Sequence, residues 1–421
     1  MAERRAINGA HWPNARFWHL EQCLRSVGPT GAVTLLHIQA FDDALINSHR
    51  DDENCGTFGK LRYGYAPQGI PAAPERLIHV RCYHPFSLSL QPRAYAEHIA
   101  NMLADWRGSR DQADLRANLW DDPFVCVSSS NETNLHYENG DPNPANQWMY
   151  QTVDHYKRLA EWDLRFWERI DELVPSRRAL RVSPAVAEGH EPDGYPVDGH
   201  YQIPEMRAMI EAADILGVHL YAVLNTDKTS GVDGANKYWY IFRAFRPPLF
   251  RDESDPGGVV MQFKGKPFLA TEAGTFTHSD KGRTDETWAN MHGLYVECLS
   301  HRTCLGVTWF IWNSDGAHPQ NTIWTNEALR GKMEAAPRYW TDAAVPVRQV
   351  LPPVVTPPTP EASEGFAVGP GVLAAMEEME DAPATSEVYI GAPGRQMSLT
   401  RGKAGHLYVA AEEDGWKVTV H

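Results

Sequence analysis

Residues 124–134 read FVCVSSSNETN, and residues 268–276 read FLATEAGTF. Each stretch is an apolar run, as expected for a buried strand, that stops at small polar residues with one glutamate. The glutamate is Glu132 in the first stretch and Glu272 in the second. Parallel sheets present functional side chains at the carboxyl ends of their strands. We therefore expect the two glutamates to belong to one site.

Similar apolar runs alternate with longer amphipathic stretches over most of the chain, which is typical of repeated βα units around a parallel sheet. These repeats predict an α/β protein with a (β/α)8 TIM barrel over residues 1–345. Its active site would lie at the carboxyl ends of the strands. A doubly wound open sheet is the alternative, but the G-x-G-x-x-G turn typical of that fold is missing. The expected strands are 6–11, 32–39, 77–84, 123–131, 179–186, 217–224, 266–273 and 305–312, with helices over 92–107, 147–174, 203–216 and 285–300.

The chain changes character after the predicted barrel. Residues 346–370 are rich in proline and form a predicted linker that favours extended conformations. Residues 371–421 form a predicted small extension, with a short acidic helix followed by strand-like pieces at 386–391 and 406–420. This extension is short for an independent core. It would pack on the barrel or allow self-association with another copy.

Charge and hydropathy restrict the classes of partner. The formal net charge is −15, which provides no basic surface for nucleic acid or for an anionic membrane. The N-terminal residues lack the apolar segment of a secretory signal, so a cytoplasmic location is expected, or secretion if a signal has been removed. The six cysteines are spread without a C-x-x-C pair and are expected to be reduced thiols.

Two carboxylates facing each other across a barrel mouth match the requirements of glycoside hydrolysis. One carboxylic acid protonates the leaving oxygen, while an ionised carboxylate attacks the sugar or activates water. A single glutamate at a strand end could equally cap a loop or form a salt bridge. A matched pair at the ends of the fourth and seventh strands is harder to explain as structural.

The motifs SSSNETN and FLATEAG resemble those of a known group of enzymes. SSSNETN is similar to the Asn-Glu motif that ends strand 4, and FLATEAG to the Thr-Glu-x-Gly motif that ends strand 7, in the 4/7 clan of retaining glycoside hydrolases, clan A. That clan contains cellulase-, mannanase- and xylosidase-type barrels. The motifs do not distinguish between families of the clan. The resemblance implies that Glu132 is the acid/base and Glu272 the nucleophile, and that Asn131 binds a sugar hydroxyl.

Three further substrate-binding residues follow from the same resemblance. His219 and Tyr221 share one face of strand 6, and the clan places a tyrosine hydroxyl near the nucleophile there. Trp312, near the end of strand 8, corresponds to the tryptophan beneath the sugar. On strand 3, His84 and Arg81 could also contact the sugar, although the clan usually carries its arginine on strand 2.

One geometric condition applies to Asn131 and Glu132. Neighbouring residues of a regular strand point to opposite faces, so both reach the site only if the strand ends or bulges before them.

Other interpretations remain open at this point. An inverting hydrolase would pair Glu132 with a different carboxylate, such as Asp227 or Asp315, and a non-catalytic carbohydrate-binding barrel would have the same composition. The histidines show no metal-ligand spacing, so we expect no metal and no other cofactor. The partner predicted by all these interpretations is an oligo- or polysaccharide, whose sugar and linkage the sequence does not identify.

Overall fold

The computed structural model describes part of the chain. The described residues are 5–6, 8–12, 23, 31–38, 61–64, 72–83, 91–107, 116–187, 191–196, 198–222, 243–248, 254–275, 279–310, 323–336, 340–348, 387–392, 395–401, 407–411 and 417–420. They fall into two compact units, Met1–Pro353 and Val354–His421. Each unit is described separately below.

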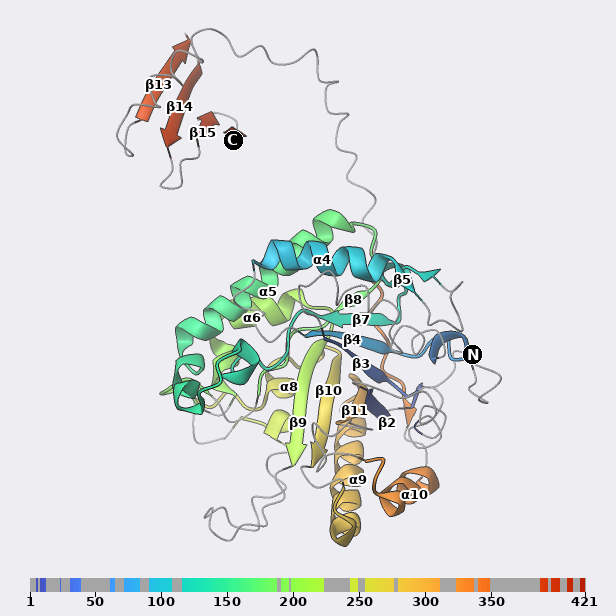
Figure 1. Cartoon of the computed structure of the whole chain (residues 1–421). Helices are drawn as coiled ribbons and strands as arrows, with labels where there is room; N and C mark the ends of the chain where they lie inside the picture. Colours follow the sequence, from blue (N-terminus) through green and yellow to red (C-terminus); the bar gives the residue numbers. More distant parts are fainter. Residues whose placement is uncertain are drawn as a thin grey trace. The chain divides into compact units, whose positions relative to one another are not determined.

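An eight-stranded sheet forms the centre of the first unit (Figure 1). Every pairing within it is parallel, which confirms an α/β protein with a parallel sheet. The order across the sheet is β8-β7-β4-β3-β2-β11-β10-β9. The strands are β2 (Asn8–Trp12), β3 (Val33–Ile38), β4 (Ile78–Tyr83), β7 (Val125–Ser128), β8 (Leu180–Arg181), β9 (Leu216–Ala222), β10 (Phe268–Thr275) and β11 (Cys304–Trp309).

The first and last strands of this order, β8 and β9, also contact each other. A parallel bridge joins Val182 to Ile215. The backbone N–H of Ser183 donates to the carbonyl of Ile215 at 2.9 Å, and that of Ile215 to Arg181 at 3.0 Å. The N–H of Gly217 donates to the Ser183 hydroxyl at 3.0 Å. We call this contact the β8–β9 seam.

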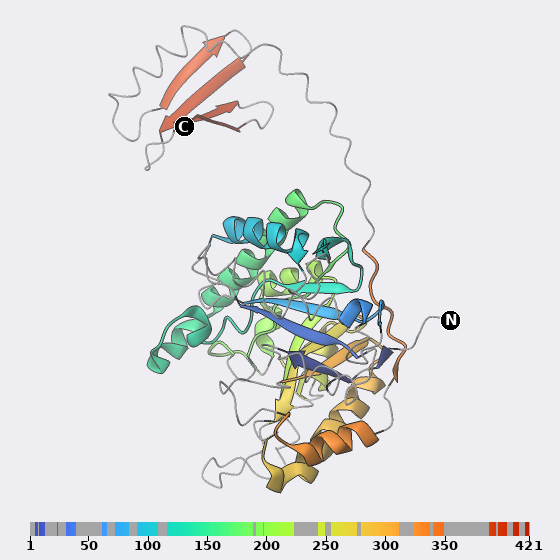
Figure 2. The same ribbon diagram turned by 45° about the vertical axis from the view of Figure 1, so that its right-hand side comes forward.

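Helices follow the strands along the chain and cover the sheet (Figures 1 and 2). α5 packs between α4 and α6, and α9 packs against α10. The buried residues of α5 recur at spacings of three and four, which is the amphipathic pattern of a helix that packs on a sheet. The helices are α4 (Pro92–Ala104), α5 (Val153–Leu173), α6 (Pro204–Ala212), α8 (Val259–Gln262), α9 (Thr284–Ser300) and α10 (Glu327–Ala335).

Several predicted boundaries were too generous, because short polar caps and turns end the elements earlier. The helix predicted over 147–174 begins at Val153, where the Thr152 hydroxyl accepts from the N–H of His155. The residues before it form a separate 3-10 helix, η7 (Pro144–Tyr150). The helix predicted over 92–107 ends at Ala104, and its last residues form β5 (Trp106–Arg107).

Short elements complete the first unit. β5 pairs antiparallel with β6 (Arg116–Ala117), and β1 (Arg5–Ala6) pairs antiparallel with β12 (Trp340–Thr341). The other 3-10 helices are η5 (Leu119–Asp121), η6 (Tyr137–Asn139), η8 (Gly199–Gln202), η10 (Arg243–Phe245) and η11 (Lys281–Arg283).

The core separates into two apolar clusters. The larger cluster includes the buried faces of the helices and the strand residues that meet them. The smaller takes residues at or near the beginnings of seven strands: Ala32, Leu77, Cys126, Leu180, Ile215, Leu269 and Leu305. Apolar packing therefore occupies the amino ends of these strands and leaves their carboxyl ends to polar side chains.

The second unit contains a four-stranded antiparallel sheet in the order β13-β14-β15-β16. Its strands are β13 (Glu387–Ala392), β14 (Arg395–Arg401), β15 (Leu407–Ala411) and β16 (Lys417–Val420). The sequence predicted the first strand and the final pair but missed β14, whose polar, arginine-flanked sequence RQMSLTR looks like a loop. The predicted linker mostly, and the predicted acidic helix entirely, lie outside the described residues.

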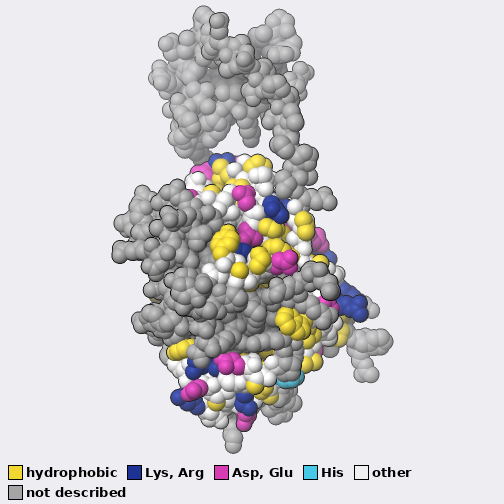
Figure 3. All heavy atoms as spheres, turned by 90° about the vertical axis from the view of Figure 1, so that its right-hand side faces the viewer, with side chains coloured by type: hydrophobic (Ala, Val, Ile, Leu, Met, Phe, Trp, Pro, Cys, Tyr) yellow, Lys and Arg dark blue, Asp and Glu magenta, His cyan; other side chains and the backbone are white. Residues whose placement is uncertain are grey.

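One face of the protein shows how charged side chains are distributed in the described part. On the face in Figure 3, acidic and basic side chains are interspersed among apolar ones in the described part. None of the described helices combines the length and the hydropathy needed to cross a bilayer. The five cysteines within the described ranges are buried free thiols.

Gly217→Ala tests the β8–β9 seam. A Cβ at Gly217 would lie 2.4 Å from the carbonyl oxygen of Ser183, so the seam would have to open. We expect a loss of about 1–3 kcal/mol in the free energy of unfolding, as for other overpacked sites. Urea titration monitored by tryptophan fluorescence measures this change.

Gly331→Ala is the matched control. Gly331 lies within α10, and an added Cβ there meets nothing within 4 Å. Alanine favours a helix over glycine by about 1 kcal/mol, so this variant should be as stable as the parent or more stable. Equal stability of the two variants would show that the seam tolerates a side chain.

Candidate active site

Glu132 lies in the loop that follows β7. The strand ends at Ser128, three residues before Asn131, and Glu132 adopts a positive φ of 36°. The condition that the strand ends before Asn131 and Glu132 is therefore met. A side chain at positive φ costs about 1–3 kcal/mol, so other contacts must hold this conformation. One of them is the bond from the N–H of Glu132 to the carbonyl of Ala185 at 3.0 Å.

Glu272 lies on an irregular part of β10. The pairing of β10 with β9 shifts register between Ala270 and Glu272, and its pairing with β11 shifts between Ala270 and Ala273. Such an irregularity changes the direction of the side chains that follow it. Here it leaves Thr271 without a partner on β9, and both Thr271 and Glu272 without partners on β11.

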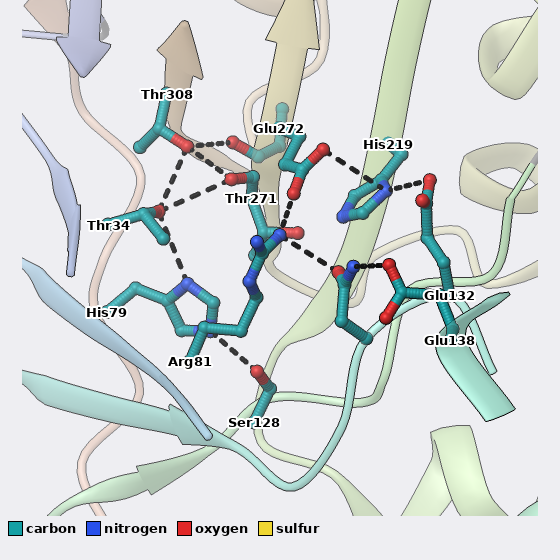
Figure 4. Close-up of polar contacts among 12 residues, drawn as sticks. Thr34, His79, Arg81, Ser128, Glu132, Glu138, His219, Thr271, Glu272 and Thr308 are labelled. Carbon is teal, nitrogen blue, oxygen red and sulfur yellow. Dashed lines mark hydrogen bonds and ion pairs between the residues drawn. The ribbon is translucent and has the colours of Figure 1, made fainter. Parts of the chain in front are cut away.

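Hydroxyl groups on two other strands, β11 and β3, satisfy the carbonyls at this irregularity (Figure 4). Thr308 donates to the carbonyls of Ala270 and Thr271 at 2.9 and 2.6 Å. The hydroxyl of Thr34 lies 3.3 Å from the Thr271 carbonyl and 3.0 Å from the Thr308 hydroxyl. His79 continues this buried network, with Nδ1 3.2 Å from Thr34 and Nε2 3.0 Å from Ser128. These buried hydrogen bonds thus support the backbone of β10 next to Glu272.

Two groups contact the carboxylate of Glu272 directly. Arg81, on β4, forms an ion pair with it, and the hydroxyl of Tyr221, on β9, donates to it. Glu272 is 3% exposed. The contacts place a positive charge and a hydrogen-bond donor on a buried carboxylate, as its charged form requires.

Glu132 has a different partner. Its Oε1 lies 2.7 Å from Nδ1 of His219, which is also 3.8 Å from Oε2 of Glu272 (Figure 4). Burial lowers the pKa of His219, although the nearby Glu132 acts in the opposite direction. The imidazole is therefore neutral near pH 7. One of its tautomers accepts a hydrogen bond from the protonated Glu132, whereas the other donates a hydrogen bond to it.

The two glutamates approach closely. Single atoms from Glu132, His219 and Glu272 all lie within 4.8 Å of one another. The same three side chains could supply ligands to a metal ion, but the guanidinium of Arg81 on Glu272 opposes a second cation there. The expectation that no metal or cofactor is needed stays a prediction.

Asn131 lies between a cation and a third carboxylate. Its Oδ1 accepts from Arg81 at 2.9 Å, and its Nδ2 donates to Oε1 of Glu138 at 3.3 Å. These two contacts define the orientation of the amide. Sequence reasoning missed Glu138, because no motif or periodicity marks a glutamate in the loop after Glu132. The structure adds an ion pair of Arg81 with Glu272 that the sequence did not predict, and the expected contact of Arg81 with sugar stays a prediction.

Contacts outside the sheet anchor the end of β7. The hydroxyl of Ser129 donates to Asp163 on α5, and Arg181 donates to the other oxygen of Asp163 at 2.5 Å. Burial raises the pKa of Asp163, and Arg181 acts against that change. These contacts hold Ser129, three positions before Glu132, against α5.

The loop after Glu132 is held in the same way. The side chain of Asn134 donates to the carbonyl of Ala187 at 2.8 Å and accepts from its N–H at 2.7 Å. These contacts fix the loop to the segment after β8, which brings Glu132 toward His219 on β9.

The structure brings together six of the eight residues predicted for the site: Glu132, Glu272, Asn131, Arg81, His219 and Tyr221. His84 and Trp312 lie outside the described residues. The alternative carboxylates Asp227 and Asp315 also lie outside them.

No protein-family model matches the sequence, and no curated protein matches it. Among solved structures, the chain is similar to a GH128 subgroup II endo-β-1,3-glucanase from Sorangium cellulosum, with 14% identity and a TM-score of 0.42 over 80% of this chain and 100% of that one. A GH128 subgroup I endo-β-1,3-glucanase mutant from Amycolatopsis mediterranei, in complex with laminaritriose and laminaribiose, gives 14% identity and a TM-score of 0.39 over 79% and 99%. A hyperthermophilic β-glucosidase mutant gives 11% identity and a TM-score of 0.41 over 77% and 94%. All three of these proteins are glycoside hydrolases.

Four buried histidines around the site predict how stability depends on pH. Burial lowers the pKa of His155 to about 4 and of His200 to about 3, and it also lowers the pKa of His79 and His219. The unfolded chain binds these protons near pH 6.5, whereas the folded protein binds them only at lower pH. The free energy of unfolding of the protein should therefore decrease as the pH falls from about 6.5 toward 4. Each histidine contributes up to about 1.4 kcal/mol per pH unit to this decrease.

Urea unfolding at several pH values between about 7.5 and 5 measures this slope. The carboxyls of Asp163 and Asp198, whose pKa values burial raises, oppose it, but the histidines outnumber them. His155→Gln keeps a donor for the carbonyl of Thr133 and should reduce the slope by the share of one histidine. Stability that stays flat or rises on acidification would contradict neutral buried histidines.

Proposed function

We propose that this protein is a retaining glycoside hydrolase that cleaves β-glycosidic bonds, with Glu272 as nucleophile and Glu132 as acid/base. The observation that carries the proposal is the different surroundings of two carboxylates that lie within reach of each other. Glu272 is buried on Arg81 and Tyr221, whereas Glu132 shares a hydrogen bond with the neutral His219. Pairs of carboxyl groups in contrasting environments divide into a base or nucleophile and an acid.

In the first step, an oxygen of Glu272 attacks the anomeric carbon of the substrate. The glycosidic C–O bond breaks, and the leaving oxygen takes the proton of Glu132. Arg81 and Tyr221 hold the carboxylate of Glu272 in place for the attack. The product of this step is a glycosyl ester on Glu272, and Glu132 becomes a carboxylate.

In the second step, Glu132 removes a proton from a water molecule. The oxygen of that water attacks the anomeric carbon, and the bond to Glu272 breaks. Glu132 is protonated again and both residues return to their starting states. Asn131, oriented by Arg81 and Glu138, is placed to bind a sugar hydroxyl in both steps. His84 and Trp312 remain proposed sugar contacts.

The separation of the carboxyl groups favours retention over inversion. Retaining enzymes hold the two groups about 5–5.5 Å apart, whereas inverting enzymes leave roughly 6.5–9.5 Å for a water molecule. Oxygens of Glu132 and Glu272 within 4.8 Å of each other support the first class. A non-catalytic binding barrel has no need of an arginine and a tyrosine on one buried carboxylate.

We also infer that the eight parallel strands close into a (β/α)8 barrel, and that residues 1–345 form its catalytic domain. The bridge between Val182 and Ile215 supports closure, because it joins the two ends of the strand order. The predicted partner is an oligo- or polysaccharide.

Glu272→Gln tests the nucleophile. The amide keeps the shape of the side chain but cannot form the glycosyl ester, so turnover should fall by at least about 10³-fold on aryl β-glycosides. In the parent, a 2-deoxy-2-fluoro aryl β-glycoside should add one sugar mass to the peptide that contains Glu272. Mass spectrometry checks this, and the surface variant Glu327→Gln is the control. Labelling of another carboxylate would show that this other residue, and not Glu272, is the nucleophile.

Glu132→Ala tests the acid/base. Its loss should reduce turnover of substrates with poor leaving groups by about 10²–10⁴-fold, because only these need a proton to depart. Activated aryl glycosides should still form the intermediate, and azide should then release it as a glycosyl azide. Comparing the two substrate types with and without azide measures both effects. Equal losses on both types, with no rescue, would indicate a structural role for Glu132.

A further inference from the structure

The ring of Tyr221, whose hydroxyl donates to Glu272, packs against a second aromatic ring, that of Phe310. The two ring centroids lie 6.0 Å apart, and the ring planes meet at 73°. Edge-to-face pairs with centroids about 4.5–7 Å apart are a preferred arrangement of aromatic side chains. Phe310 therefore contacts the residue that holds the proposed nucleophile.

The two rings come from the strands on either side of β10. Phe310 directly follows β11, and Tyr221 lies on β9 (Figure 1). Neighbouring strands are about 4.8 Å apart, so the two side chains meet only by reaching over β10 from both sides. In the ladder with β9, Gly274 pairs with Tyr221, and Glu272 lies two positions before it on the same face. Gly274 brings no side chain to that face, which carries the nucleophile.

The backbone of Phe310 is fixed next to the nucleophile. Its N–H donates to the carbonyl of Ala273, the residue after Glu272, at 2.7 Å. The side chain is 9% exposed, yet neither of the two apolar clusters of the described residues includes it. Phe310 is thus a buried ring at the carboxyl ends of the strands, among the polar side chains of the site. Its position indicates a role other than packing in the core.

We propose that Phe310 is a positioning residue for the nucleophile, because its ring restricts that of Tyr221 to the orientation in which the hydroxyl donates to Glu272. This inference rests on the proposed function of Glu272. A tyrosine ring moves about two side-chain torsions, and a hydrogen bond weakens steeply as its angle departs from linear. Phe310 therefore acts on the carboxylate through Tyr221.

Two further contacts of Glu272 come from other residues. Arg81 forms its ion pair from β4, and Nδ1 of His219 lies 3.8 Å from Oε2. Both contacts remain in a variant that lacks the ring of Phe310, so the carboxylate keeps its positive partner. The ring of His219 also meets that of Tyr221, with centroids 6.3 Å apart. Loss of Phe310 should therefore loosen Tyr221 and leave the rest of the site in place.

A spectroscopic cycle tests the contact without any assay of activity. 3-Fluorotyrosine is incorporated into the full-length protein, and the 19F signal of Tyr221 is assigned by its loss in Tyr221→Phe. Glu272→Gln should shift this signal, because the hydroxyl of Tyr221 donates to that carboxylate. In a Phe310→Leu background the same substitution should shift the signal by less than half as much. An equal shift in both backgrounds, including none in either, would overturn the proposal whether or not the protein is a glycosidase.

Phe310→Leu then tests the effect on the reaction, because leucine keeps most of the volume but lacks the ring. The value of kcat/KM should fall about tenfold, as expected when one hydrogen bond to a charged group is weakened. The loss should be equal for good and poor leaving groups, since the nucleophile serves both. Adding Phe310→Leu to Tyr221→Phe should cause no further loss, because the hydroxyl is already absent. Losses that multiply in the double variant would contradict a role through Tyr221.

Phe263→Leu is the matched control. Phe263 is 7% exposed and meets Tyr201 edge-to-face, with centroids 6.5 Å apart. Both leucine variants should lose similar stability in urea titrations, but only Phe310→Leu should lose turnover. Equal losses of turnover would contradict a role specific to Phe310. If the 2-fluoro glycoside does not label Glu272 in the parent, the proposed function fails, and the spectroscopic cycle still decides whether Phe310 positions Tyr221.

Discussion

The contact between β8 and β9 is the constraint on which the site depends. Glu132 follows β7 and Glu272 lies on β10, and these strands are near opposite ends of the order across the sheet. The bridge from Val182 to Ile215 brings those ends together. It also places His219 on β9 between the two carboxylates. Gly217 permits the approach, because any Cβ there would overlap the carbonyl of Ser183.

Two local irregularities then direct the side chains. A regular strand would alternate its side chains between the faces, and neither glutamate follows a regular strand. The early end of β7 and the positive φ of Glu132 turn one residue toward the site, while the register shift in β10 turns the other. Hydroxyls of Thr34 and Thr308 satisfy the carbonyls released by that shift. The strain at the site is thus supported by buried hydrogen bonds on several strands.

The electrostatic contrast between the glutamates comes from the strands beside them. Arg81 and Tyr221 reach Glu272 from β4 and β9, and His219 reaches Glu132 from β9. Because His219 is buried, its pKa is lowered and it contributes a neutral ring rather than a second cation. One carboxylate therefore meets a positive charge and the other a proton acceptor or donor, which is the division that acid and nucleophile require.

The sequence by itself determined the parallel strands and the positions of both glutamates, because apolar runs and the polar residues that stop them are local patterns. It also placed Asn131 at a strand end, and His219 and Tyr221 on one face of a strand. Only the tertiary structure decided what those residues contact: Arg81 on Glu272, Glu138 on Asn131, and His219 on Glu132. The sequence also did not predict β14 or the first and last residues of several helices, because these depend on pairing partners and capping contacts. The physical reason is that a hydrogen bond between residues 50 or 87 positions apart, such as Arg81 to Asn131 or His219 to Glu132, leaves no periodic signal in the chain.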